Sequence, residues 1–349
     1  MTLHTNGHAT VAAPAPPIDL YTTCPPFRGS DYTAYVKHVC DVSRWSDQAG
    51  CKGMLVYTDN GLLDPWLVSQ IVLQNTTSLA PLVAVQPVYM HPYSVAKMVS
   101  TLGYLYGRRL CLNMVAGGFR NDLIALNDLT PHDRRYDRLV EYTTIIQRLL
   151  AGGAPVTFEG EFYRIDQLSL KPPLPKELFP VITISGSSPA GLAAAHSLGA
   201  IPVAYPEPPD KLSSQPENGN GGAGIRVGII ARAQEEEAWE IADRRFPPDR
   251  AGQLKHDLAM KVSDSSWHRT LSDLGSAIKE SRSTYWLWPF QNYKGFCPYL
   301  VGSYQQVADE VLRYVSAGCR TFILDVPESA EELAHIGVVF TQAQQRSIV

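Results

Sequence analysis

A hydroxyl-rich turn is the stretch of this sequence best suited to binding an anion. A short apolar run, residues 181–184, predicts a buried strand, and Ser185, Gly186, Ser187 and Ser188 follow it directly. Pro189 then suits the first turn of a helix, where its missing N–H costs nothing. Free backbone N–H groups and hydroxyls thus gather at the positive end of a helix, and phosphate is the usual ligand of such a site. The alternative is an ordinary crossover in which the serines only cap the helix.

Polar residues also follow the ends of other apolar runs. Tyr57 and Thr58 close the run that begins at Gly53, and Asn113 lies near the end of residues 110–114. Arg226 lies within residues 225–231. Taken singly, Asn113 could be a strand-end cap and Arg226 a salt-bridge partner. If the strands form a barrel, however, their carboxyl ends meet on one face, which is where such folds carry out chemistry.

The order of the elements predicts that barrel. Apolar runs that indicate strands begin near residues 18, 53, 82, 110, 181, 201, 225 and 321, and nearly every gap carries a helical pattern. Eight such units favour an α/β fold of the (β/α)8 TIM-barrel type with insertions, one of them a hairpin over residues 156–170. An open, doubly wound sheet is the alternative, but no GxGxxG follows the first strand.

Composition bounds the class of protein. With 45% hydrophobic and 18% charged residues the chain is typical of globular proteins, and a net charge of −4 does not favour nucleic acid as a partner. The six cysteines show no CxxC and no zinc spacing, so we expect no metal site and a reducing, cytoplasmic setting. We expect no signal peptide and no contact with a membrane, because no apolar run is long enough to span one.

A single domain is predicted over residues 17–349. Residues 1–16 are rich in Ala, Pro and Thr, and we expect them to form a disordered tail. A polar, glycine-rich stretch near residues 208–224 is expected to be a flexible connector within the domain.

Several segments, in this order, resemble the bacterial luciferase-like flavin-dependent monooxygenase superfamily, most closely its alkanesulfonate monooxygenase branch. The segments are GMLVYTDNGLLDPW at 53–66, LCLNMVAGG at 110–118, PHDRRYDRLVEYTTIIQRLLAG at 131–152 and ISGSSPAGLAAA at 184–195. The resemblance extends over residues 18–345, and it is the order of the motifs, more than any one of them, that carries it.

The resemblance implies a barrel that binds reduced FMN, supplied by a separate flavin reductase, and that forms a homodimer or homotetramer. Asn113 matches an asparagine near the flavin, and His132 and Tyr136 match an H-x-x-R-Y pattern at its phosphate. The turn at 185–188 matches the phosphate turn, and Tyr57 and Thr58 complete the predicted cofactor-binding set. Without the resemblance, His132 would read as a surface residue at a helix start and Tyr136 as core packing.

The substrate side departs from the alkanesulfonate branch. Leu62 stands where that branch has a cysteine, and Gly228 stands where it has a histidine, two residues after the retained Arg226. Other polar positions of that branch meet residues of a different kind: Thr23 and Cys24, Tyr293 and Lys294, Pro327 and Ser329. The combination predicts a retained oxygenation chemistry with another substrate.

The predicted function is therefore that of an FMN-dependent monooxygenase, which uses reduced FMN and O2 to oxygenate a small organic substrate in specialised metabolism. N-hydroxylation, C–S cleavage and Baeyer–Villiger insertion stay open. Arg226 and Lys294 are the predicted catalytic residues, holding an anionic group; for Lys294 the alternative is a solvated loop charge. Two other functions stay open: a deazaflavin-dependent oxidoreductase on the same fold, and a non-catalytic flavin-binding paralogue.

The same resemblance implies that the aromatic segment 285–298 is a mobile lid over the flavin. It places Trp286, Trp288, Phe290, Tyr293 and Phe296 around Lys294 without a helical or strand period. So much aromatic surface is not expected to face water permanently, and closure over the flavin would bury it. A fixed plug or a subunit interface is the alternative.

Overall fold

The computed structural model describes residues 17–27, 29, 31–211, 222–262, 271–272, 274 and 282–346. The tail predicted over residues 1–16 and residues 212–221 of the predicted connector lie outside the described residues.

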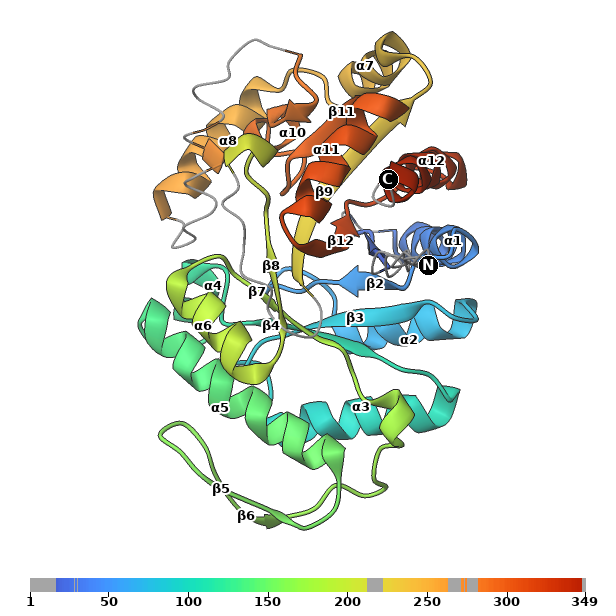
Figure 1. The fold of residues 1–349 in the computed structure, drawn as a ribbon. Helices are drawn as coiled ribbons and strands as arrows, with labels where there is room; N and C mark the ends of the chain where they lie inside the picture. Colours follow the sequence, from blue (N-terminus) through green and yellow to red (C-terminus); the bar gives the residue numbers. More distant parts are fainter. Residues whose placement is uncertain are drawn as a thin grey trace, which may run out of the picture.

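Eight parallel strands close into a barrel, as predicted (Figure 1). Around the barrel the order is β9, β12, β1, β2, β3, β4, β7 and β8, and β8 pairs back with β9. The strands are β1 (Asp19–Thr23), β2 (Gly53–Val56), β3 (Ala80–Val85), β4 (Cys111–Val115), β7 (Ile182–Ser185), β8 (Ile201–Ala204), β9 (Ala223–Arg232) and β12 (Cys319–Leu324). Their apolar runs are continuous because a parallel sheet is covered on both faces, and every residue of β2 and β3 is buried.

Helices surround the barrel and pack on its outer face (Figure 1). They are α1 (Tyr32–Gln48), α2 (Pro65–Asn75), α3 (Pro92–Tyr106), α5 (His132–Ala151), α6 (Pro189–Leu198), α7 (Glu235–Arg245), α11 (Tyr304–Ser316) and α12 (Ala330–Arg346). Local signals set their ends: α6 begins at Pro189 after the cap residue Ser188 and ends at Gly199, whose φ of 60° suits glycine. None of the described helices is both long and apolar enough to cross a bilayer.

Four elements interrupt the regular alternation. The predicted hairpin is present as β5 (Val156–Glu159) and β6 (Arg164–Leu168). The short helix α4 (Arg120–Ala125) lies between β4 and α5. Helix α8 (Arg250–Val262) follows α7.

A further strand was not predicted from the sequence. Strand β11 (Tyr299–Ser303) pairs in parallel with residues 228–232 of β9, whereas residues 223–227 of β9 pair with β12. The first half of the ten-residue strand β9 thus pairs with β12, and its second half pairs with β11. The expectation that residues 285–298 lack regular structure is also wrong, since they contain β10 (Tyr285–Trp286), paired with β11, and α10 (Trp288–Gln291).

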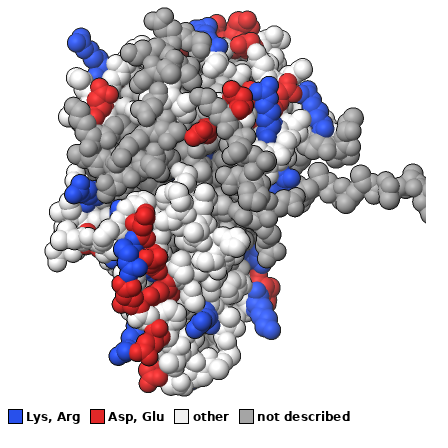
Figure 2. All heavy atoms as spheres, turned by 60° about the vertical axis from the view of Figure 1, so that its left-hand side comes forward, with Lys and Arg blue, Asp and Glu red and all other residues white. Residues whose placement is uncertain are grey.

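The molecule has charges of both signs on the face that carries α4 and α5. Figure 2 shows Lys and Arg mixed with Asp and Glu on this face, with uncharged areas between them. Much of this mixing comes from ion pairs on the surface, such as Arg134 with Asp137 at 2.5 Å.

Candidate functional site

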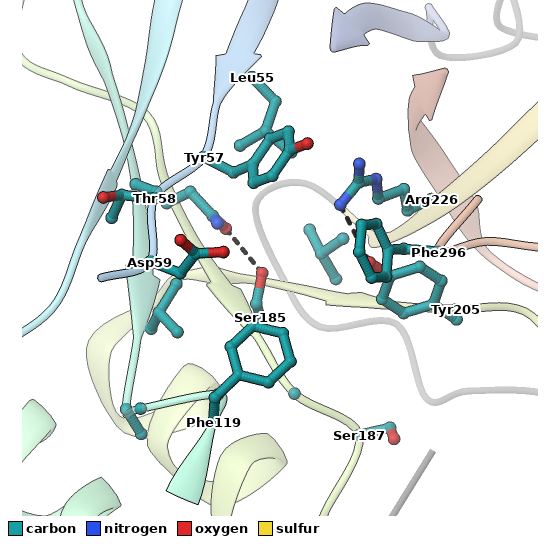
Figure 3. Close-up of a pocket in the computed structure, with 18 of the residues that line it drawn as sticks. Leu55, Tyr57, Thr58, Asp59, Phe119, Ser185, Ser187, Tyr205, Arg226 and Phe296 are labelled. Carbon is teal, nitrogen blue, oxygen red and sulfur yellow. Dashed lines mark hydrogen bonds between the residues drawn. The ribbon is translucent and has the colours of Figure 1, made fainter. Parts of the chain in front are cut away.

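One cavity of about 180 Å³ lies at the carboxyl ends of the barrel strands (Figure 3). It brings together residues that the sequence separates by more than a hundred positions. All nine predicted cofactor-binding residues and one of the two predicted catalytic residues line it: Tyr57, Thr58, Asn113, His132, Tyr136, Ser185, Gly186, Ser187, Ser188 and Arg226. Apolar walls at Phe119 and Phe296 complete it.

The turn after β7 is shaped to present N–H groups to this cavity. The Gly186 N–H donates to the Val203 carbonyl at 3.1 Å, which fixes the turn against β8. Ser188 caps α6, accepting the Gly191 N–H at 3.2 Å. The alternative in which serines cap the helix therefore holds for Ser188, but the Ser187 hydroxyl makes no hydrogen bond to a described residue. It stays available at the positive end of the helix.

Tyr136 of α5 meets this turn from the other side. Its hydroxyl is hydrogen-bonded to Ser188, and burial raises the pKa of Tyr136, so the phenol keeps its proton and can donate. A Cβ added at Gly186 would lie 2.3 Å from the Tyr136 hydroxyl oxygen, and Gly186 has a φ of +150°. Only glycine lets the turn and the phenol approach this closely.

Asn113 of β4 is held with its amide group in a fixed orientation. Its Oδ1 accepts hydrogen bonds from Thr183 at 2.8 Å and from Ser185 at 3.0 Å, the second of which is drawn in Figure 3. The residue is only 4% exposed. With the oxygen engaged twice, the NH2 group is left to donate into the cavity.

Arg226 of β9 forms the wall opposite the turn. Its guanidinium lies 5.3 Å from the ring centre of Tyr57 and 5.8 Å from that of Tyr205. Nη1 donates to the Tyr205 hydroxyl at 3.0 Å (Figure 3). Nη2 lies 3.9 Å from Oδ1 of Asp325, and Nε is buried without an acceptor among the described residues. Burial raises the pKa of Tyr205 to about 12, so at neutral pH its hydroxyl is protonated.

The remaining two predicted residues are placed less deeply. His132 begins α5, contacts the Tyr136 ring edge-on and has its Nδ1 2.7 Å from an oxygen of Asp133. Lys294 does not line this cavity, and its Nζ lies 2.5 Å from Asp249. Lys294 and Arg226 instead both line a second cavity.

A second cavity of about 500 Å³ adjoins the first. The two share the side chains of Tyr57, Arg226 and Phe296, which form a partition between them. The rest of the second cavity is lined by the start of α1, the segments that follow β1 and β12, and the C-terminal end of α7. Lys294, Gly295 and Tyr299 of β11 complete it. Tyr205 and Asp325 directly follow strand runs and so lie where the sequence predicts residues of the site, whereas Phe296 was predicted only as part of the lid.

The aromatic segment 285–298 is anchored in the core. Tyr285, Leu287, Phe290 and Cys297 are buried, and Nε1 of Trp288 donates to the Phe246 carbonyl at 3.1 Å. Phe296, which faces both cavities, therefore extends from a packed base.

The residues that line the first cavity fit a flavin that carries a phosphate group. The turn offers N–H groups, a hydroxyl and a glycine cradle to a phosphate, and Tyr136 adds a neutral donor. Asn113 presents an amide donor beside apolar walls suited to a flat ring system. Among the described residues no cluster of side chains could hold a metal ion.

Comparison with known proteins agrees with this geometry. A family model described as luciferase-like monooxygenase matches residues 19–321. A protein of Niallia circulans, the 4-(gamma-L-glutamylamino)butanoyl-[BtrI acyl-carrier protein] monooxygenase BtrO, is 35% identical over 311 residues, which cover 87% of this chain and 91% of that protein.

Solved structures share the fold at low identity. The riboflavin lyase RcaE superposes with a TM-score of 0.75 at 14% identity, covering 96% of this chain and 93% of that one. The EDTA monooxygenase EmoA of Chelativorans sp. BNC1 gives 0.69 at 16% identity, covering 96% and 95%. An F420-dependent secondary alcohol dehydrogenase gives 0.64 at 16% identity, covering 94% and 99%.

Proposed function

The chain belongs to the luciferase-like monooxygenase family, and from this premise we propose that it is an FMN-dependent monooxygenase that uses reduced FMN and O2 to oxygenate a small organic substrate. The observation that carries the proposal is the first cavity, in which a phosphate-binding turn, Asn113 and Arg226 converge. We place the chain beside the alkanesulfonate monooxygenase branch, with a changed substrate side.

The residues of the first cavity would divide the work as follows. The N–H groups of Ser187 and Ser188 and the Tyr136 hydroxyl would hold the phosphate, and the Asn113 amide would donate to the polar edge of the ring. Reduced FMN, when bound, would supply the two electrons that activate O2, so that one oxygen atom enters the substrate and the other leaves as water. Phe119 and Phe296 exclude water from the ring, and Arg226 holds the oxygen of an anionic or carbonyl group at the partition.

We propose that the substrate is an acyl group carried as a thioester on an acyl-carrier protein, within specialised metabolism. The support is the 35% identity to BtrO over 91% of that protein, whose name gives an acyl group on an acyl-carrier protein as its substrate. Gly228 and Leu62, which replace polar residues of the alkanesulfonate branch, also favour a substrate other than a sulfonate. The bond that is oxidised stays open among N-hydroxylation, C–S cleavage and Baeyer–Villiger insertion.

The experiment supplies the protein with FMN, a flavin reductase, NADH, ¹⁸O2 and the 4-(γ-L-glutamylamino)butanoyl carrier protein. The expected result is a carrier-bound product that gains one ¹⁸O atom. Peroxide release without product would instead favour a non-catalytic flavin-binding paralogue. Turnover with reduced deazaflavin but not with reduced FMN would favour the deazaflavin-dependent alternative.

The phosphate assignment is tested separately by binding. Ser187→Glu places a negative charge in the turn, so we expect the affinity for FMN to fall at least about tenfold, or ~1.4 kcal/mol. Ser197→Glu, at the exposed far end of the same helix, is the matched control and should bind FMN normally. Equal affinity in the two variants would show that the phosphate lies elsewhere.

We also propose a cytoplasmic protein that forms a homodimer or homotetramer and receives reduced FMN from a separate reductase. The support is the family membership and the scattered free cysteines, five of which are buried.

A further inference from the structure

Arg226 and Asp325 are two buried, oppositely charged side chains that lie close together without a hydrogen bond between them. Nη2 of Arg226 and Oδ1 of Asp325 are 3.9 Å apart, too far for a hydrogen bond. Arg226 is 9% exposed and the Asp325 side chain 17% exposed, so water screens neither charge fully. Both atoms line the second cavity, and neither has another hydrogen-bond partner among the described residues. Buried charges left in this state are costly unless a ligand supplies the missing bonds.

Tyr299 fixes the carboxylate of this pair. Its hydroxyl donates to Oδ2 of Asp325 at 2.7 Å, which leaves Oδ1 directed at the cavity. A Cβ at position 228 would lie 2.4 Å from the Tyr299 ring. The ring can therefore occupy this position only because Gly228 has no side chain. In the sequence, Gly228 stands where the alkanesulfonate branch has a histidine. In the structure it belongs to a site in which Tyr299 of β11 orients Asp325, the residue directly after β12.

The other charges of the second cavity are already satisfied. Arg245 contacts Glu332 at 2.6 Å, Glu328 at 3.2 Å and the Val326 carbonyl at 2.8 Å. Lys294 is paired with Asp249 at 2.5 Å. Asp31, which also lines this cavity, caps α1 by accepting the Ala34 N–H at 3.0 Å. Arg226 and Asp325 are the oppositely charged groups of the described wall that face each other without a hydrogen bond.

We propose that this pair binds the zwitterionic head of an α-amino acid carried by the substrate, with the carboxylate on Arg226 and the ammonium on Asp325. The carboxylate and the ammonium of an α-amino acid are bonded to the same carbon and therefore lie close together. Their charges are opposite to those of Arg226 and Asp325, respectively. A lone carboxylate would be repelled by Asp325, and a lone ammonium by Arg226. The inference deepens the proposed function, on which it rests, because a γ-glutamyl group such as the one in the BtrO substrate name ends in this head.

The test compares two small probes by calorimetry on the FMN-loaded protein: γ-L-glutamyl-4-aminobutanoate and glutaryl-4-aminobutanoate, which differ only in the α-amino group. We expect the probe with the amino group to bind at least about tenfold more tightly. Without the amino group, the Asp325 carboxylate is left without a partner of opposite charge on the ligand. In Asp325→Asn the preference should fall to within about threefold. Tyr299→Phe should lower it partly, since the carboxylate loses its orientation.

The control is Asp309→Asn, which removes a carboxylate from a surface pair with Arg346 and should keep the full preference. FMN affinity is measured for every variant and should not change, because Asp325 and Tyr299 do not line the first cavity. Equal binding of the two probes by the parent protein, or no binding of either at millimolar concentration, overturns the amino-acid assignment. Loss of FMN binding would instead count against the proposed function.

Discussion

Gly186 shows how much of the site depends on a single residue. The turn after β7 can offer its N–H groups to a phosphate only because the chain bends at a φ of +150° beside the Tyr136 hydroxyl. The serines around it supply hydrogen bonds, but the glycine supplies the space. A hydroxyl-rich turn without that glycine would cap α6 equally well and bind no phosphate.

Replacing Gly186 by alanine should therefore impair FMN binding. The added Cβ would lie 2.3 Å from the Tyr136 oxygen, so either the turn or the phenol must move. We expect the affinity for FMN to fall at least about tenfold, or ~1.4 kcal/mol, in a fluorescence titration. Gly337→Ala, on α12 with nothing within 4 Å of the added atom, is the control. Normal affinity in Gly186→Ala would contradict the cradle.

At the scale of elements, the sequence predicted the barrel strands because each is an apolar run covered on both faces. The first cavity followed from them, since strand ends meet on one face whatever the details of the loops. Strand β11 was not predicted, because YLVGS directly follows the aromatic segment and no helix separates it as a unit. The pairing of Tyr299 with Asp325 could not be predicted either, since it joins β11 to β12 through the space left at Gly228.

The link between α4 and α5 is held by an ion pair whose effect can be measured. Arg138 of α5 contacts Asp128 at 2.6 Å, and Thr130 donates to the same carboxylate. Burial opposes ionisation of Asp128, but the bonds from Arg138 and Thr130 outweigh it and lower its pKa to about 2. Since the folded pKa lies below the unfolded value, the stabilisation is complete above about pH 4 and is lost as the pH falls towards 2.

Asp128→Asn should thus cost about 2 kcal/mol in the free energy of unfolding at pH 7. Urea unfolding at neutral pH and near pH 3 measures this, and the difference between the variant and the parent should shrink at the lower pH. The control is Asp133→Asn, which changes an exposed carboxylate at the start of α5. A difference that stays constant with pH would show that the ion pair is not its source.

The aromatic segment is a packed wall with a short, partly exposed tip rather than a long loop. At the tip the Lys294 and Gly295 N–H groups donate to the Pro289 carbonyl at 2.9 and 3.2 Å. Phe290, Asn292 and Cys297 are buried, so any closure must take place between residues 293 and 296. If this tip is the predicted lid, Tyr293, at 39% exposed, should be cut by chymotrypsin in the free protein and protected by FMN with a substrate. Cleavage that ligands do not change would make the segment a fixed wall, and Lys294 would then have no gating role.

The whole molecule places the site between two packed halves. One apolar cluster joins α3, α5 and α6 to β3, β4 and β7, and it carries the predicted flavin side (Figure 1, lower half). The other joins α11 and α12 to β9, β11 and β12 (Figure 1, upper half), and Arg226, Tyr299 and Asp325 lie on these strands or directly after them. Asn113, Tyr136 and the turn after β7 thus belong to one half and Gly228 of the changed substrate side belongs to the other, whereas Leu62 follows β2.

This division predicts that short alkanesulfonates are poor substrates even though the flavin side is intact. A sulfonate presents negative oxygens and no donor, so at Arg226 it would meet the Asp325 carboxylate, whose Oδ1 lies 3.9 Å from Nη2. Leu62 and Gly228 offer no side-chain donor in return. We expect kcat/KM for sulfite release from pentanesulfonate to be at least about tenfold below that for oxygenation of the γ-glutamyl carrier substrate.

Asp325→Asn, which removes the repelling charge, should raise the rate of sulfite release from pentanesulfonate relative to the parent protein. Sulfite release by the parent protein at a rate comparable with oxygenation of the carrier substrate would show that the substrate half has kept the sulfonate function.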